Sequence, residues 1–426
     1  MTPPSSARPK RVAVVAACPY PTLQGSQVLV RHLTKGLAAR GHRVVVVAYA
    51  EGLEDVLDGI PIRRIVRIPG IRARRSGPRA SKLVLDLALL WTLVGVLRRE
   101  RIELVHAHNY EGALVGLVAS KLVGVPLIYH SHNALAEELP TYFRWRLTRE
   151  LARAFGAVID RMVPRRADHC IAICRELVDF LRARGVEEGA IRMIAPGSSL
   201  EEFPVRSETE ASAIRARFGF GTRPILLYTG NLDGYQNVDL LLASIARVRK
   251  AVPEALLVIA THATRREMPA VLQRSVDGVE LLRTADFATI RDLLTVADVA
   301  LLPRHEWSGF PMKLLNYMAA GKPVVVSAGS AKAIRHGLNG WVVPDGRPEA
   351  YARAIIDLLA APRLRAALGR AARRTVEDEY GWDRVLDQVE TTYQHVLDEH
   401  AAGMHAASRT LPEDSRVGAV GTVRAP

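Results

Sequence analysis

The amino-acid sequence predicts an α/β protein made of two doubly wound parallel sheets. The chain has 426 residues, which is too long for one ordinary hydrophobic core. Short apolar runs typical of buried parallel strands alternate with helical segments over both halves of the chain. Hydrophobic residues make up 49% of the chain and charged residues 24%, which suits a globular protein with a substantial interior.

The first half begins with a strand-like run over 11–17, a turn-rich loop and a helix with Val30 and Leu33 on one face. Gly41 ends that helix, and the next strand follows at 43–48. This order of strand, loop, helix and strand has the length of a right-handed crossover between parallel strands. Further strand-like runs lie at 62–68, 102–107, 125–130 and 169–173.

The second half repeats this alternation, with a domain boundary predicted near 191–217, where a strand-like run ends in Pro196-Gly197 and an acidic stretch follows. Its strand-like runs lie at 224–230, 255–260, 279–282, 299–302 and 323–327. Ligands of doubly wound sheets bind beyond the carboxyl ends of the strands, so the loops that follow strands are the candidate sites. The expected parts are a first domain over 1–198, a second over 199–380, a helical segment over 381–399 that packs back towards the first domain, and a disordered tail over 400–426.

Composition restricts the class of protein further. The cysteines Cys18, Cys170 and Cys174 lack the spacing of a zinc site, so we expect reduced, buried thiols in a reducing compartment, the cytoplasm. The amino terminus has no apolar stretch of signal-peptide length. The most apolar run, 83–97, is too short to span a bilayer comfortably and contains Asp86. It therefore predicts a buried helix, with membrane insertion as the alternative.

The net charge of +14 favours anionic partners: nucleotides, phospholipid surfaces or nucleic acid. No zinc-finger or RNA-recognition signature is present, so we expect no nucleic acid and favour a membrane surface. Two regions carry much of the charge. Residues 63–82 contain Arg and Lys but no acidic residue, and Tyr142-Phe143-Arg144-Trp145-Arg146 opens a long basic helix. Aromatic and basic residues together suit anionic lipid, and a solvated charged face is the alternative.

The most informative stretch, residues 304–326, is a polar loop that runs from the strand before it into a helix beginning near Pro311. Ser308 or Gly309 is placed to cap that helix, and proline is favoured in its first turn. A helix N-terminus offers unpaired amides and a partial positive charge, which suit a pyrophosphate. Lys313 adds a full charge in that turn.

Asn316 lies one turn beyond Lys313 on the same face of the helix, within reach of a ribose diol. The alternative is a capped surface helix with an incidental lysine. Asparagine is a middling helix former and Gly-Phe-Pro is unusual as a mere connection, so we favour a binding role.

This stretch resembles the donor-site signature of retaining glycosyltransferase family 4, which has the GT-B fold. Gly309-Phe310 leads into a helix that ends in MAAGKPVV at 318–325, and HGLNGWVV follows at 336–343. The resemblance also includes the loop around Gly25, Gly41-His42, the strand end at His106-Ala107-His108 and the late helix, and it covers about 10–398. It implies two facing Rossmann-like domains with an interdomain cleft, a nucleotide-sugar donor in the second domain and an acceptor in the first.

The sequence departs from the family pattern at the donor site, which makes it a variant with a Gly-Phe-Pro-x-Lys segment. The family usually carries two glutamates at the positions of Ser308 and Asn316. Asn316 could still bond ribose hydroxyls, and Glu306 could partly substitute for the first glutamate. After the first strand of the second domain, the family commonly has Arg and Lys to hold the donor phosphates. Here Gly230 is followed by Asn231 and Gln236 at those places, so Lys313 is the best compensating cation, and Arg304 the second.

In the first domain, Ile-Tyr-His130-Ser-His132-Asn133 ends a strand, and alternation places both histidines on one side of it. The family has a histidine near the transferred sugar at this strand end, and His132 is the better match. A neutral imidazole could bond a sugar hydroxyl or the developing charge, whereas a structural histidine is the alternative. His108-Asn109 ends the preceding strand, and with His130 and Asn133 it is a candidate for acceptor contact. His106 is expected to pack in the core.

Gly25-Ser26 opens a helix after the first strand, where backbone approach and a helix start favour phosphate, although this is not the full dinucleotide fingerprint. No Asp-x-Asp lies at a strand end, so we expect no metal and no cofactor. The diphosphate would then rely on helix ends and Lys313.

These observations predict a metal-independent glycosyltransferase, retaining by resemblance, that uses a UDP- or GDP-linked sugar. The acceptor is expected to be a lipid-linked or cell-envelope glycan, reached from the cytoplasm at the inner face of the membrane. His132 and Lys313 are the catalytic candidates. A non-catalytic scaffold that lost the family's charged residues is one alternative, and a nucleotide-sugar epimerase of the same architecture is the other. Residues predicted to bind the donor are Gly25, Ser26, Gly230, Asn231, Gln236, Arg304, Glu306, Ser308, Gly309, Phe310 and Asn316.

Overall fold

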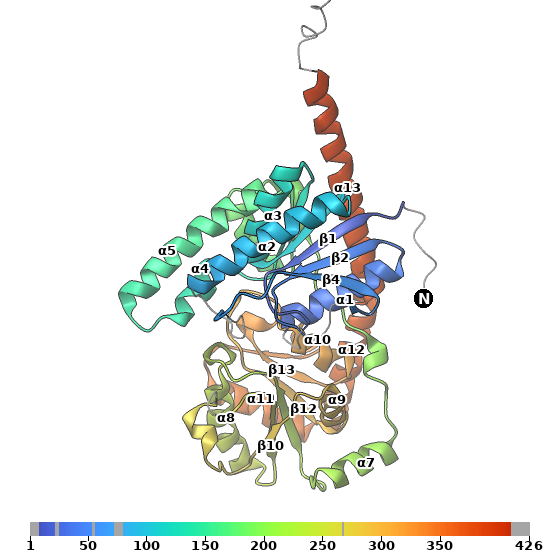
Figure 1. Ribbon diagram of the computed structural model, residues 1–426. Coiled ribbons are helices and arrows are strands. Elements are labelled where there is room, and N and C mark those ends of the chain that lie inside the picture. The colour runs from blue at the N-terminus through green and yellow to red at the C-terminus, as the bar shows by residue number, and fades with distance from the viewer. Residues whose placement is uncertain (1–7, 22–24, 53–55, 72–79, 266–267, 410–426) are drawn as a thin grey trace, which may run out of the picture.

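The computed structural model describes residues 8–21, 25–52, 56–71, 80–265 and 268–409, and it contains two α/β domains, one above the other in Figure 1. The first domain is built on an eight-stranded sheet of order β3-β4-β2-β1-β5-β6-β7-β8. Its strands are β1 (Arg11–Ala16), β2 (Arg43–Ala48), β3 (Val56–Leu57), β4 (Ile60–Arg64), β5 (Leu104–His108), β6 (Leu127–Ser131), β7 (His169–Ala172) and β8 (Ile191–Met193). Its helices are α1 (Gly25–Ala39), α2 (Ala80–Arg99), α3 (Asn109–Val123), α4 (Leu135–Glu138), α5 (Arg146–Met162) and α6 (Arg175–Ala183).

The second domain is built on a six-stranded sheet of order β11-β10-β9-β12-β13-β14, with all neighbouring strands parallel. Its strands are β9 (Ile225–Thr229), β10 (Leu256–Thr261), β11 (Val279–Arg283), β12 (Val299–Leu302), β13 (Val324–Ser327) and β14 (Trp341–Val343). The helices of this part are α7 (Glu208–Arg217), α8 (Val238–Ala251), α9 (Phe287–Val296), α10 (Met312–Ala319), α11 (Pro348–Ala360) and α12 (Pro362–Glu379). Two parallel-sheet domains confirm the predicted fold class.

The central strands form because their apolar side chains are buried on both faces, as parallel sheets require. Residues 12–16 of β1 and 225–229 of β9 are buried throughout. Strands β3 and β14 were not expected from the sequence, because each is only two or three residues long. The parallel register brings the carboxyl ends of β1, β5 and β6 to one edge of the first sheet.

The last helix, α13 (Trp382–Arg409), packs against the first domain. Val389 and Tyr393 lie in the same buried cluster as Val12 and other side chains of the first sheet. A buried hydrogen bond also ties the helix to this domain, because His42 Nε2 lies 2.7 Å from a carboxylate oxygen of Glu390. The expectation of a disordered tail from residue 400 is wrong for its first ten residues, since this alanine-rich stretch continues the helix. Residues 410–426 lie outside the described residues.

The apolar run over 83–97, expected to be a buried helix, is buried on one face only. It lies in α2, where Leu89 and Leu93 are fully buried, but Leu83, Leu87 and Trp91 are 68%, 59% and 78% exposed. A helix that is apolar all round can pack one face on the sheet and leave the opposite face uncovered. Within the part of the chain that the structure describes, no helix combines the length and apolar character needed to cross a membrane.

Candidate functional site

Lys313, in the first turn of α10, is the centre of the candidate donor site in the second domain. Its ammonium lies 3.0 Å from the Tyr228 hydroxyl and 3.0 Å from the side-chain oxygen of Gln236. It also lies 4.2 Å from the centre of the Tyr228 ring, which is a cation–π distance. Tyr228 belongs to β9 and Gln236 follows in the next loop, so the end of β9 and the start of α10 converge on one cation.

The surroundings of Lys313 lower its affinity for a proton. Part of the side chain remains exposed, but burial of the ammonium lowers the pKa of Lys313 to about 7. The nearby Arg304 lowers this pKa further, and Asp233 opposes the effect. The hydrogen-bond acceptors of the ammonium among the described residues are neutral oxygens. An anionic ligand bound beside this ammonium would favour its charged form and raise its pKa again.

Two glycines leave space beside the candidate catalytic side chains. Gly230 follows β9 with a φ of +121°, and a Cβ atom there would lie 2.7 Å from the Lys313 ammonium. Gly309 has a φ of +83°, and a Cβ there would lie 3.0 Å from the His132 carbonyl oxygen, across the domain interface. Both the backbone conformation and the lack of space require glycine. The structure therefore brings Gly309, predicted from the second domain, against His132, predicted from the first.

Arg304 and Asn231 order the loops beside Lys313. The Arg304 guanidinium donates a hydrogen bond to the Ser308 carbonyl and lies 5.3 Å from the centre of the Tyr235 ring. Its Nε is buried and has no partner among the described residues. Asn231 donates to the Tyr235 hydroxyl at 3.0 Å and to the Asp233 carboxylate at 2.5 Å. Arg304 thus keeps one N–H for a ligand, whereas the Asn231 amide is already bonded.

The expected capping of α10 by Ser308 or Gly309 is wrong. The N-cap residue is Pro311, and no side chain caps the helix. The Ser308 hydroxyl accepts a hydrogen bond of 2.8 Å from the backbone N–H of Ala134 in the first domain. The serine precedes the helix by too many residues to cap it, so its hydroxyl joins the two domains instead. The first amides of α10 consequently have no side-chain acceptor, which suits an anionic ligand.

The remaining donor candidates differ in accessibility. Phe310 is buried, with its ring centre 6.1 Å from that of Tyr380, so it contributes packing. Glu306 is half-buried, and desolvation raises the pKa of its carboxyl. Asn316 is half-buried on α10. Gly25 and Ser26 are the first residues of α1, and their side-chain surroundings lie outside what the structure describes.

Four histidines form the site of the first domain, at the ends of β5 and β6. His108 Nδ1 lies 2.9 Å from His132 Nε2, and His106 Nε2 lies 3.0 Å from His130 Nδ1. His106 Nδ1 also lies 2.6 Å from the Tyr393 hydroxyl of α13. His108 is opposite His130 in the parallel register, so alternate side chains of both strands meet on one face of the sheet.

Burial makes these imidazoles neutral at physiological pH. It lowers the pKa of His106 to about 3 and that of His132 to about 4, and it also lowers the pKa values of His108 and His130. The Nε2 atoms of His108 and His130 are enclosed without a hydrogen-bond partner among the described residues. The backbone carbonyl of His132 faces Gly309 of the second domain. His106 is buried, in agreement with its expected place in the core.

The histidine cluster could also hold a metal ion. One ring nitrogen from each of His106, His108 and His130 lies within 4.8 Å of the others. The His106 ring is stacked on those of His108 and His130, with centroids 4.5 Å and 5.1 Å apart. His106 Nε2 and His130 Nδ1 are directed at each other in a hydrogen bond of 3.0 Å, so the ring nitrogens do not converge on one point, as tetrahedral coordination requires. The residues present therefore fit a metal only after the rings rotate and the His106–His130 hydrogen bond breaks.

Beside this cluster, Asn133 and Glu138 form a polar group that the sequence analysis only partly anticipated. Asn133 donates a hydrogen bond to Glu138, and the Tyr142 hydroxyl donates to the other carboxylate oxygen at 2.9 Å. Desolvation raises the pKa of Glu138. Asn109 opens α3 with a left-handed φ of +59°. Nothing in the local sequence distinguishes Glu138 from its neighbour Glu137, so only the folded chain identifies it.

Two tyrosines of the candidate sites were not predicted from the sequence. Tyr228 binds the Lys313 ammonium, and Tyr393 binds His106. Tyr228 lies in the mostly apolar run ILLYTG, and a buried tyrosine hydroxyl usually needs a partner. That signal was available in the sequence. Tyr393 belongs to an amphipathic helix far along the chain, where no local pattern points to His106.

Two family models match the chain. The model described as "Glycosyl transferases group 1" matches residues 223–361, and the model described as "Glycosyl transferase 4-like domain" matches residues 24–197. The D-inositol 3-phosphate glycosyltransferase of Geodermatophilus obscurus is 29% identical to the chain, and the alignment covers 96% of this chain and 94% of the relative. The enzyme of the same name from Rhodococcus jostii is 26% identical, and the alignment covers 97% of this chain and 95% of the relative.

Solved structures share the fold. Sucrose-phosphate synthase from Thermosynechococcus elongatus has a TM-score of 0.77 at 19% identity and covers 92% of this chain and all of the other. HepE of Anabaena in complex with UDP and glucose has a TM-score of 0.73 at 17% identity and covers 91% of this chain and all of the other.

Proposed function

Because this chain is a glycosyltransferase of the family 4 type with the GT-B fold, we propose that it transfers a sugar from a nucleoside diphosphate held at Lys313 to an acceptor beside His132. The single observation that carries this proposal is the Lys313 ammonium, whose hydrogen-bond acceptors among the described residues are neutral oxygens at and just after the end of β9. Such a cation is suited to the diphosphate of a donor.

The position of Lys313 also offers a reason for the departures from the family pattern. The family commonly has a cation where this chain has Gln236. Here the Gln236 oxygen accepts a hydrogen bond from Lys313, which reaches the same place from α10. The variant Gly-Phe-Pro-x-Lys segment would thus supply the positive charge from α10 instead of from the loop after β9, at the same place in the site. Arg304, with its unpartnered Nε, is the second candidate for phosphate contact.

In the proposed reaction, the bond between the anomeric carbon and the diphosphate oxygen breaks, and the electron pair leaves with the nucleoside diphosphate. The acceptor hydroxyl oxygen bonds to the anomeric carbon, and its proton passes to the departing phosphate oxygen. Lys313 and the uncapped start of α10 would stabilise the charge that develops on the diphosphate. The neutral His132 would bond a sugar hydroxyl. Retention of configuration is an expectation from the family, and we propose metal-independent transfer because Lys313 and α10 would supply the positive charge.

The donor is proposed to carry UDP or GDP. UDP is supported by HepE, whose solved complexes contain UDP, glucose or UDP-glucose. The acceptor is proposed to be a lipid-linked or cell-envelope glycan precursor at the cytoplasmic membrane surface, because the first domain is basic and exposes aromatic residues. D-inositol 3-phosphate is the second candidate acceptor, since the relatives that match nearly the whole chain carry its name.

The first test is calorimetric titration of the purified protein with UDP, GDP and their common sugar conjugates. One nucleotide class should bind, and Lys313→Ala should weaken that binding by at least tenfold, or about 1.4 kcal/mol. The matched control is Lys250→Ala, an exposed lysine of α8. Absence of binding to every nucleotide would refute the donor site and favour the scaffold alternative.

Turnover separates the remaining alternatives. Nucleoside diphosphate release that requires an acceptor supports transfer, whereas conversion of the donor sugar without release indicates an epimerase. Product stereochemistry by nuclear magnetic resonance then tests retention. Offering D-inositol 3-phosphate and a lipid-linked glycan in separate reactions identifies the acceptor class.

A further inference from the structure

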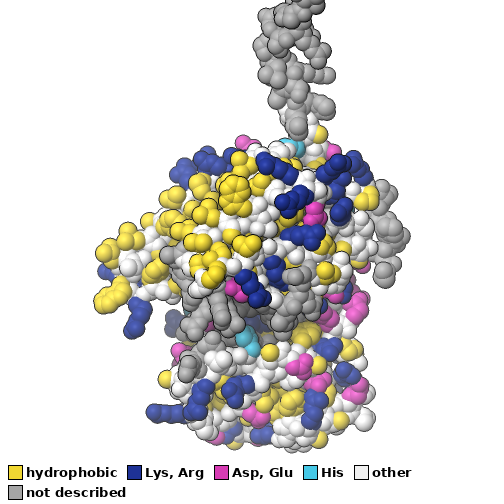
Figure 2. Space-filling view, in the orientation of Figure 1, with side chains coloured by type: hydrophobic (Ala, Val, Ile, Leu, Met, Phe, Trp, Pro, Cys, Tyr) yellow, Lys and Arg dark blue, Asp and Glu magenta, His cyan; other side chains and the backbone are white. Residues whose placement is uncertain are grey.

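Large apolar side chains are exposed mainly on one region of the first domain. Thirteen of the twenty-one exposed large hydrophobic residues among the described residues lie between residues 83 and 158. Figure 2 displays many of them as a yellow area over the region of α2 and α5. We call these thirteen residues the apolar face: Leu83, Val84, Leu87, Trp91, Leu114, Val118, Leu122, Tyr142, Trp145, Leu147, Leu151, Phe155 and Val158.

Helix α5 is packed in a way that turns its large side chains outward. Its buried residues are Ala152, Gly156 and Asp160, a stripe at four-residue spacing. A Cβ on Gly156 would lie 2.7 Å from the Ala136 backbone, so the helix lies directly against α4. Large apolar residues on its outer faces are exposed, including Leu151 and Phe155, which are 62% and 60% exposed. The sequence thus places small residues inside and large apolar residues outside.

Helices α2 and α3 continue the apolar face. On α2 the exposed positions recur at Leu83, Leu87 and Trp91, and on α3 at 114, 118 and 122. Each series has four-residue spacing, so each forms a stripe along one side of its helix. The two helices pack against each other, which places the stripes on adjoining elements. Contiguous apolar surface of this extent marks an interaction site.

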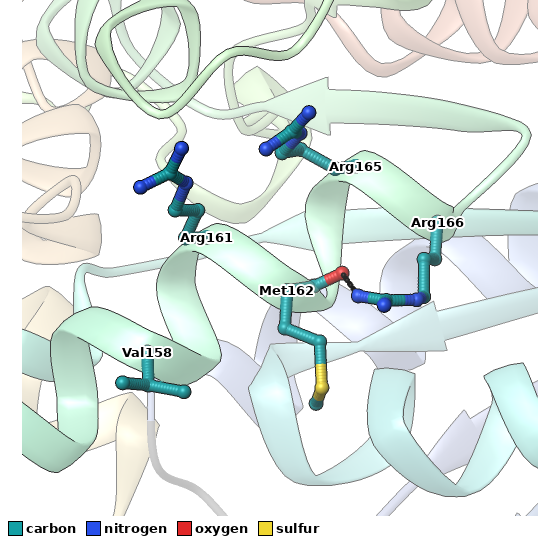
Figure 3. A pocket seen from close by; sticks show the side chains of 5 residues that line it. All are labelled: Val158, Arg161, Met162, Arg165 and Arg166. Carbon is teal, nitrogen blue, oxygen red and sulfur yellow. Dashed lines mark hydrogen bonds between the residues drawn. The ribbon is translucent and has the colours of Figure 1, made fainter.

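Positive charge accompanies the apolar residues of α5. Residues 142–166 contain seven arginines, and their acidic residues are Glu150 and the buried Asp160. Figure 3 shows a depression at the end of α5 lined by Val158, Arg161, Met162, Arg165 and Arg166. The guanidinium groups of Arg161 and Arg165 lie on the same side of the helix in this view. The depression therefore combines apolar walls with cationic groups suited to a phosphate.

The other basic region differs from this one. Arg63 pairs with Glu100 at 2.9 Å, and Lys82 pairs with Glu111 at 2.6 Å. Arg64 donates to the Tyr20 carbonyl at 2.8 Å. These cations are bonded within the protein, whereas Arg72, Arg74, Arg75 and Arg79 of the same region lie outside the described residues.

We propose that the apolar face of α2, α3 and α5 inserts into the interfacial layer of a membrane containing anionic lipid, with Arg161, Arg165 and Arg166 binding lipid phosphates. Trp91 and Trp145, each 78% exposed, are of the type that settles at the level of the headgroups. The leucines, Phe155 and Val158 reach the start of the acyl chains. This surface depends on no step of the proposed reaction, but it deepens the proposed function by naming the face that would approach a lipid-linked acceptor.

Charge favours a membrane over a second copy of the chain. In a two-fold dimer built on this face, the arginines of one α5 would oppose those of the other, with Glu150 as the exposed acid of residues 142–166. Anionic lipid supplies the complementary charge. Flanking arginine around exposed tryptophan and leucine is the pattern of an interfacial helix.

The test is co-sedimentation of the full-length protein with vesicles of phosphatidylcholine alone and of phosphatidylcholine with 30% phosphatidylglycerol. The protein should bind the anionic vesicles at least tenfold more tightly, with a blue shift of tryptophan fluorescence that Trp91→Phe together with Trp145→Phe abolishes. Leu151→Gln with Phe155→Gln should weaken binding at least tenfold. Both residues are exposed, so folding should persist, and Val205→Gln, 83% exposed elsewhere, is the matched control.

The charge component is tested separately. Arg161→Gln, Arg165→Gln and Arg166→Gln together should remove the preference for anionic vesicles, whereas Arg353→Gln, an exposed arginine of α11, should leave it unchanged. Equal binding of wild type and the Leu151/Phe155 variant would overturn the proposal. So would a dimer in sedimentation analysis that the same variant converts to monomer without change in vesicle binding. Each variant is also titrated with the nucleotide by calorimetry. Unchanged nucleotide affinity would show that a loss of vesicle binding is independent of the donor site.

Discussion

The two domains present opposite electrostatic solutions at equivalent sheet edges. At the end of β9, the Lys313 ammonium donates hydrogen bonds to the neutral oxygens of Tyr228 and Gln236. At the ends of β5 and β6, four neutral histidines bond to one another, and burial keeps them uncharged. The first arrangement suits an anion, and the second suits the hydroxyls of a sugar. A shared fold therefore leaves the chemistry to side chains placed at the strand ends.

The strongest test of this contrast is His132→Ala, which should reduce turnover on the order of 100-fold or more while donor affinity changes less than twofold. The reason is that the His132 imidazole belongs to the histidine cluster, beside which the transferred sugar is proposed to lie, whereas Lys313 is held by Tyr228 and Gln236 of the second domain. Turnover is measured as nucleoside diphosphate release, and affinity by calorimetry.

The matched control for this variant is His169→Gln. His169 is also buried in the first sheet, but both of its ring nitrogens lack hydrogen-bond partners among the described residues. It should leave turnover intact. Equal losses in both variants would mean that His132 acts only through the stability of the domain.

A second test displaces the Lys313 ammonium by changing a neighbouring residue. Gly230→Ala should weaken nucleotide binding by about tenfold, because its Cβ would lie 2.7 Å from the Lys313 ammonium and displace it. The positive φ of +121° adds strain, so the melting temperature should also fall by a few degrees. Gly234→Ala is the control, since a Cβ there meets nothing within 4 Å. Unchanged affinity in Gly230→Ala would show that the ammonium position does not matter.

These tests depend on residues that the sequence located to different degrees. Lys313 and Gly309 could be predicted because they lie in one loop and the helix that follows it, where spacing alone decides their place. The hydrogen bond between Ser308 and Ala134 joins residues 174 positions apart, so no local pattern contains it. The same holds for His106 and Tyr393. Local chemistry is thus readable from the chain, whereas partnerships between domains need the fold.

The apolar run of α2 illustrates a further limit of sequence analysis. Mean apolar character predicts burial, but it does not say how many faces of a helix find a partner. Leu89 packs inward and Trp91 outward within one turn. Strands β1 and β9 were simpler, because a central parallel strand is covered on both faces and its composition alone predicts that.

The pH dependence of nucleotide binding should give a smaller effect with a definite sign. The free protein holds Lys313 at a pKa of about 7, and a bound diphosphate would raise it. Binding therefore takes up a proton above pH 7, and the dissociation constant should rise with pH, by at most tenfold per unit. The phosphate itself is fully ionised above about pH 7.5. Calorimetry between pH 7.5 and 9 should show the rise in wild type and a flat profile in Lys313→Met.

The same shift also affects stability without ligand. In the unfolded chain Lys313 would have its ordinary pKa of 10.5, so between about pH 7 and 10.5 the unfolded state holds the additional proton. The contribution of this residue to the free energy of unfolding therefore rises with pH across that interval. A profile of nucleotide binding that is equally steep in Lys313→Met would assign the titration to another group.

The smallest effect is expected from metal removal. Dialysis against EDTA should change turnover less than twofold, because Lys313 and the uncapped start of α10 are proposed to meet the charge of the diphosphate. The histidine cluster gives this experiment a second arm. Added Zn²⁺ would have to break the hydrogen bond between His106 and His130 and rotate stacked rings before His106, His108 and His130 could share it. Loss of turnover in EDTA that Mg²⁺ restores would place a metal at the diphosphate. Restoration by Zn²⁺ only, abolished in His106→Gln, would instead place a metal among the histidines. The electrostatic contrast between the two domains would then be wrong.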